Sequence, residues 1–105
     1  MTQLAKTPSP PYYAVIFTSL RTEVDEDYAA TSIKMLGLAQ QIDGYLGVES
    51  AREELGITVS YWRDLKSIQN WKKQQDHLAA QALGKQKWYR SYSVRIAKVE
   101  RDYEF

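Results

Sequence analysis

The sequence contains no cysteine and a single histidine, His77, and these two shortages exclude several kinds of chemistry. Without thiols the chain cannot form disulfides, thiolate nucleophiles, zinc-thiolate centres or cysteine-ligated iron–sulfur clusters. One imidazole cannot build a site of several histidines, although it could be a single axial or shared ligand. We therefore expect no metal site within one chain.

The sequence also lacks an excess of either charge and lacks long apolar runs. Fourteen Lys and Arg residues against thirteen Asp and Glu give a formal net charge of +1, so no global field attracts nucleic acid or an anionic membrane surface. No segment approaches the roughly 20 apolar residues of a membrane span, and the first eleven residues lack the apolar region of a signal peptide. We expect a cytoplasmic protein that binds neither nucleic acid nor membranes.

Aromatic residues, in contrast, are abundant: three Trp, eight Tyr and two Phe make up 12% of 105 residues. Aromatic rings suit a core, an interface or a pocket for a flat ligand. The length is typical of one domain. Residues 1–11 contain all three prolines and no periodicity, which predicts an extended arm, and the folded domain is expected over residues 12–105.

The apolar periodicity predicts the element order β-α-β-β-α-β. Asp25 is expected to cap a first helix that ends near Gly44, and Asp64 to cap a second helix that breaks and restarts at Asp76, continuing to Leu83. The expected strands, with a hairpin turn at 54–56, are residues 12–21, 45–53, 57–62 and 88–100. This order predicts an α+β, ferredoxin-like fold, an antiparallel sheet with helices on one face.

The first and third strands carry bulky residues on both faces. On the first strand Val15 and Phe17 alternate with Ala14, Ile16 and Leu20, and on the third Ile57, Val59 and Tyr61 alternate with Trp62. If helices cover one face, the other face exposes an apolar patch that monomers seldom tolerate. We infer a homodimer formed by sheet-to-sheet packing. A monomer with a few exposed aromatic residues is the alternative.

Three segments carry a family resemblance: GYLGVESARE before the turn, ITVSYW after it, and DLKSIQNWKKQQDHLAAQ. Over residues 12–99 the chain resembles the antibiotic biosynthesis monooxygenase family, dimeric ferredoxin-like α+β barrels that include haem-degrading enzymes. The resemblance implies a pocket between sheet and helices, near the second helix. Members oxidise flat polyphenolic substrates there without metal or flavin, or open haem.

The resemblance also separates these two activities. Trp71 matches the helix tryptophan that lines the pocket of active members. The haem-degrading branch has an axial histidine ten residues later, where this chain has Gln81, and an asparagine on the first strand, which residues 15–19 do not offer. Haem degradation is therefore disfavoured, and we expect no cofactor.

His77 is the candidate catalytic residue because its unperturbed pKa lies near neutrality. As a general base it would deprotonate a phenol to a phenolate that reacts with oxygen; alternatively it caps a helix or packs against Trp71. The expected function is a cofactor-independent monooxygenase of a small aromatic or quinol-like compound. The alternative is a non-catalytic small-ligand-binding or stress-related protein of the same fold.

The candidate substrate-binding residues are aromatic, with one arginine. A flat ligand could stack on them or bond to their polar edges, whereas core or dimer packing would explain the aromatic residues equally well. Arg90 could stabilise a phenolate or peroxide anion, or lie on the surface beside aromatic rings. These candidates are Trp71, Tyr61, Trp62, Tyr13, Phe17, Trp88 and Arg90.

Overall fold

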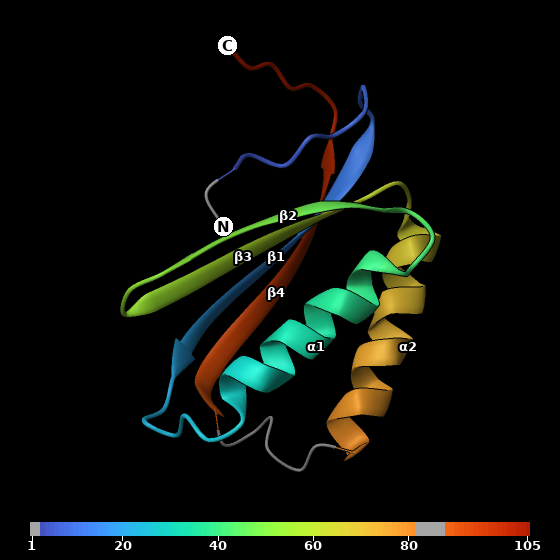
Figure 1. Cartoon of the computed structure of the whole chain (residues 1–105). Coiled ribbons are helices and arrows are strands. Elements are labelled where there is room, and N and C mark those ends of the chain that lie inside the picture. The colour runs from blue at the N-terminus through green and yellow to red at the C-terminus, as the bar shows by residue number, and fades with distance from the viewer. Residues whose placement is uncertain (1–2, 82–87) are drawn as a thin grey trace.

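The computed structural model describes residues 3–81 and 88–105, with side chains for 3–76 and 88–105. Its strands pair antiparallel in the order β2-β3-β1-β4, and both helices lie on one face of the sheet (Figure 1). This confirms the expected ferredoxin-like α+β fold. The elements are β1 (Tyr12–Arg21), α1 (Tyr28–Gln40), β2 (Tyr45–Arg52), β3 (Leu55–Trp62), α2 (Leu65–Gln81) and β4 (Tyr89–Val99).

The strand register defines two faces of the sheet. Trp62 pairs with Tyr13, and the preceding Tyr61 pairs with Ala14. Successive side chains of a strand point to opposite faces, and Trp62 packs against helix residues. We call the side of Trp62 the helix face and the side of Tyr61 the outer face.

The core lies on the helix face, between the sheet and both helices. Trp62 is fully buried, and Trp71 of α2 lies parallel to it with ring centroids 6.1 Å apart. Burial of these large apolar rings is the main stabilising contribution of the helix layer. The residues packed in or against this core are Ala39, Trp62, Ile68, Trp71, Tyr13, Val15, Met35, Leu38, Ile42 and Tyr45.

The two helices begin differently. Asp64 caps α2 as predicted, because its Oδ1 accepts hydrogen bonds from the backbone N–H of Ser67 at 2.8 Å and from the Ser67 hydroxyl at 2.7 Å. The predicted Asp25 cap of α1 is wrong. Helix α1 begins at Tyr28 after Asp27, and the Asp25 carboxylate instead pairs with Arg21 at 2.8 Å. The ion pair removes the side chain that the cap would need.

The break predicted within the second helix is also wrong, because α2 runs without interruption from Leu65 to Gln81. The helix contains no glycine or proline over this range. Lys72 and Asp76, one turn apart, form an ion pair at 3.0 Å across the expected break. The expected end at Leu83 lies outside the described residues.

The hairpin between β2 and β3 turns at residues 53–54, earlier than the 54–56 expected from the sequence. Leu55 already pairs with Leu20 of β1, and Gly56 pairs with Arg52 of β2. A Cβ at Gly56 would meet the guanidinium of Arg52. The glycine therefore belongs to the strand, where it leaves room for the arginine to lie across the sheet.

Helix α1 ends at Gln40, earlier than expected, and Gly44 stands at the entry to β2 rather than at the helix end. Gly44 has φ 99°, in the region that favours glycine. A Cβ there would also meet the side chain of Ser67. This contact brings the start of β2 against the first turn of α2.

Candidate functional site

The structure places the predicted site residues in four separate surroundings. Trp62, Trp71 and Tyr13 belong to the core, where both tryptophans are more than nine-tenths buried. The indole Nε1 of Trp62 donates to the Ser60 hydroxyl at 2.9 Å. These rings hold the helices on the sheet, and a ligand would reach them only where the core opens.

Tyr61 lies on the outer face and therefore cannot share a pocket with Trp71 in one subunit. Its hydroxyl donates to Glu49 at 2.6 Å, and its ring meets Tyr12 edge to face at 5.9 Å. Tyr12 in turn donates to Asp102 at 2.5 Å, and the backbone N–H of Ala5 donates to Glu49 at 3.0 Å. The two terminal segments thus meet over these tyrosines (Figure 1).

Burial, the Glu49 hydrogen bond and the nearby negative charge raise the pKa of Tyr61 to about 12. Tyr61 in the unfolded chain loses its proton near pH 10. Stability from neutral Tyr61 is therefore complete below pH 10 and is lost as the pH rises through about 12. We expect Glu49→Gln to lower the pKa of Tyr61 toward 10, because it removes the charge but keeps a hydrogen-bond acceptor.

Carbon NMR of labelled tyrosine rings across an alkaline titration measures this shift. Because Tyr12 also has a raised pKa, the titration is repeated in a Tyr12→Phe background to assign the late resonance. A pKa of Tyr61 that does not move in Glu49→Gln would contradict the proposed cause.

Phe17 and Trp88 belong to a cluster of five rings where α1 begins beside β1 and β4. The buried Trp88 precedes β4 by one residue, and its indole donates to the carbonyl of Glu26 at 2.9 Å. Burial and a hydrogen bond to Tyr28 raise the pKa of Tyr89. We call this group the aromatic cluster: Phe17, Tyr28, Trp88, Tyr89 and Tyr92.

The helix face continues from this cluster along β4 as an open apolar surface. Tyr92, Val94 and Ile96 pair with Ser19, Phe17 and Val15, whose side chains lie on the helix face. Yet the three β4 residues are 51–55% exposed. The described helix residues therefore leave this edge of the sheet uncovered, and an apolar ligand could contact it.

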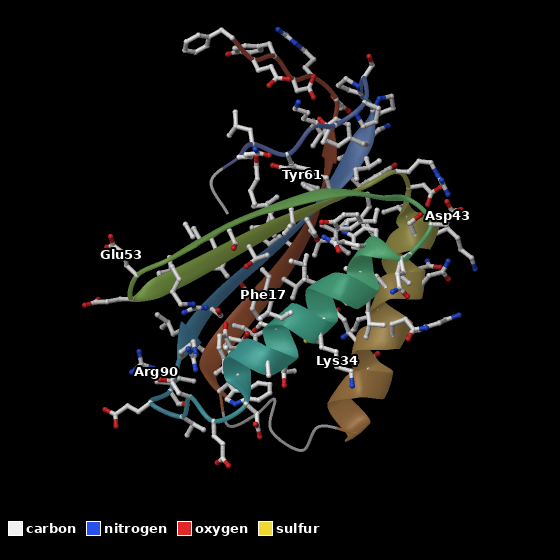
Figure 2. All side chains as sticks on the ribbon, viewed as in Figure 1. Phe17, Lys34, Asp43, Glu53, Tyr61 and Arg90 are labelled. Atoms are coloured by element: carbon white, nitrogen blue, oxygen red, sulfur yellow. The ribbon has the colours of Figure 1, made fainter. Side chains whose placement is uncertain are left out.

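Arg90 lies elsewhere, in an open cleft of about 400 Å³ at the end of the sheet next to the β2–β3 hairpin. Figure 2 shows Arg90 beside the end of β1, and Glu53 at the hairpin tip. We call this feature the arginine cleft; its lining residues are Leu20, Arg21, Arg52, Glu53, Glu54 and Arg90.

Sequence reasoning missed Arg21 and Arg52 as neighbours of Arg90. Arg52 is a strand residue that follows Val48 and Ser50 in alternation on the helix face. A charged residue at an inward position of a strand was the available signal. Its strand partner Gly56 was a second signal, since it leaves room for a large neighbour.

His77 belongs to α2, six residues after Trp71, and its side chain lies outside the described residues. No group of three or more His, Cys, Asp or Glu side chains in the described part of the chain could hold a metal ion. No helix over residues 3–81 and 88–105 is long and apolar enough to cross a membrane.

Comparison with known proteins identifies the family. No family model matches the chain. Over 100 residues, 93% of this chain and 88% of the relative, the sequence is 51% identical to YqjZ of Bacillus subtilis, which is named as an uncharacterized protein. The chain belongs to the YqjZ family. Membership of this family does not assign an activity to the chain, because the name of YqjZ states none.

Solved structures show how widely the YqjZ-family fold is shared. A Shewanella oneidensis protein has a TM-score of 0.70 at 11% identity, over 85% of this chain and 91% of that one. A candidate antibiotic biosynthesis monooxygenase of Bacillus cereus has a TM-score of 0.63 at 13% identity, over 91% and 100%. The resemblance expected from the sequence is thus confirmed as a shared fold.

Proposed function

We propose that this YqjZ-family chain is a cofactor-independent monooxygenase of a small aromatic or quinol-like compound. The observation that supports it most is the open apolar surface of β4, where Tyr92, Val94 and Ile96 stay half exposed on the face that carries the helices. With Phe17 and Tyr89 beside it, this surface suits a flat aromatic ring. The fold shared with named candidate monooxygenases agrees with it.

In the proposed reaction His77 accepts a proton from the substrate and leaves an electron-rich anion. For an anthrone the anion reacts with molecular oxygen at its CH₂ carbon. One oxygen atom becomes the new carbonyl and the other leaves in water, so that CH₂ and O₂ give C=O and H₂O. The substrate supplies all the electrons, and the reaction needs no external reductant.

Oxygen consumption with a panel of anthrone- and quinol-type compounds tests this proposal. We expect turnover by the wild type and a loss of about 100-fold or more in His77→Ala, the usual contribution of a general base. Lys73→Ala is the matched control, since Lys73 is an exposed residue of the same helix. Equal rates in the two variants would remove His77 from the mechanism.

A non-catalytic ligand-binding protein of this fold is the alternative proposal, and the same experiment separates the two. Absence of oxygen consumption by folded protein that still binds the aromatic compounds would favour it. Haem degradation stays disfavoured by Gln81, and a haemin titration with a saturable spectral shift would reopen it.

We further propose a homodimer in which two outer faces pack together. Leu55 and Ile57 are 48% and 42% exposed on this face, and Ile16, Leu20 and Val59 neighbour them in the strand register. We call these five residues the outer patch. No helix covers this face in the described part of the chain (Figure 1), and isolated monomers seldom expose apolar residues in such a contiguous group.

A further inference from the structure

The arginine cleft collects three guanidinium groups from three strands. Arg21 is the last residue of β1, Arg52 is the last residue of β2, and Arg90 is the second residue of β4. All three line the same open volume of about 400 Å³. Like charges repel, so contacts with other residues must hold the three guanidinium groups in place.

Two of the three arginines are held in place by contacts with neighbouring residues. Arg21 donates to the carbonyl of Val24 at 2.9 Å and to Asp25 at 2.8 Å, and its guanidinium lies 3.5 Å from the centre of the Tyr28 ring. Arg52 donates to the hydroxyl and the carbonyl of the buried Ser19. Donors fixed before binding lose little conformational entropy when a ligand arrives.

Two of the three guanidinium groups in the cleft make no ion pair with a described residue. Among the described residues Arg21 pairs with Asp25, whereas neither Arg52 nor Arg90 forms an ion pair. The Nε of Arg21 is buried and has no hydrogen-bond acceptor there. Because Ser19 is neutral, its bonds to Arg52 leave that charge in place. The charges of Arg52 and Arg90 can therefore bind an anionic ligand.

We propose that the arginine cleft binds the carboxylate of a small organic molecule. Guanidinium groups match the planar fork of a carboxylate, and the volume exceeds that of a simple ion and suits a small ligand. Glu53 and Glu54 also line the cleft and offset part of the arginine charge, so the site suits a singly charged anion better than a dianion. A carboxylate is therefore favoured over a phosphate.

The residues that line this site are not those of the apolar surface proposed for oxidation, although Arg21 lies against the Tyr28 ring of the neighbouring aromatic cluster. In Figure 1 the tip of the β2–β3 hairpin stands well apart from the end of α2, the helix that contains His77. The proposal does not depend on catalysis by His77. It would hold equally for an oxygenase or for a binding protein.

Calorimetric titration with benzoate tests the site, with benzamide as a neutral probe of similar shape and inorganic phosphate as a competing anion. We expect saturable benzoate binding that weakens as salt is added, no binding of benzamide, and weaker binding of phosphate. Arg90→Gln and Arg52→Gln should each weaken benzoate binding about tenfold, the effect of one lost charge-assisted hydrogen bond.

Arg95→Gln is the matched control, because Arg95 lies on the same strand as Arg90, bonds to Ser93 and does not line the cleft. Arg90 has no partner among the described residues, so its replacement should leave the fold intact, as circular dichroism will show. His77→Ala should bind benzoate as the wild type does. Equal loss in Arg95→Gln, equal binding of benzamide, or tighter binding of phosphate would each overturn the carboxylate site.

Discussion

Trp62→Ala is expected to lower the free energy of unfolding by about 3–5 kcal/mol, most of the stability of a typical small domain. Trp62 is completely buried, with a relative exposure of 0%. Its ring stacks on Trp71 and meets Tyr45 edge to face at 5.5 Å. Its removal leaves a cavity bordered by both helices. It also leaves the Ser60 hydroxyl without the hydrogen bond that it accepts from the indole.

Guanidinium denaturation followed by far-ultraviolet circular dichroism measures this loss. Tyr103→Ala is the control for the removal of an aromatic ring, since Tyr103 is 91% exposed, and its midpoint should match the wild type. Trp62→Phe should fall between the two because it keeps part of the ring contact. A loss below about 1 kcal/mol in Trp62→Ala would mean that the core does not depend on this stack.

Ile57→Lys is expected to convert the proposed dimer into a monomer at micromolar concentration. The substitution places a charge near the centre of the outer patch, where a partner sheet would bury it without a counter-ion. In the monomer the same side chain reaches solvent, because Ile57 is 42% exposed. The fold should therefore survive while association fails.

Sedimentation velocity measures the change, with Ile33→Lys as the matched control. Ile33→Lys makes the same chemical change as Ile57→Lys, but Ile33 lies on α1, away from the outer patch, and is 73% exposed. A wild-type chain that sediments as a monomer would contradict the dimer directly. Two variants that dissociate alike would show that the dimer forms through another surface.

The sequence predicted the element order because alternation and helical spacing are local properties that survive folding. The same local rules failed where a neighbouring side chain competed for the residue. Asp25 was predicted to cap α1, but its carboxylate pairs with Arg21. Gly56 was predicted to lie in the turn, but it is a strand residue that leaves space for Arg52. Both errors concern specific side-chain contacts, which composition and spacing do not encode.

The candidate site was predicted less well for a related reason. Aromatic residues were correctly seen as unusual, but their division between core, outer face and aromatic cluster depends on strand register. A shift of one residue moves a side chain to the other face, as the neighbours Tyr61 and Trp62 illustrate. The arginine cleft forms from residues 21, 52 and 90, which no short window contains.

The sheet order has a consequence for synthesis of the protein on the ribosome. β1 is central in the sheet and pairs with β4. Both edges of residues 12–21 are therefore hydrogen-bonded only after residues 89–99 have been synthesised. Until then a nascent chain exposes one edge of an apolar strand, a template for unwanted pairing with other chains. This exposure lasts until the ribosome has added the last strand, so slow codons after α2 would raise aggregation.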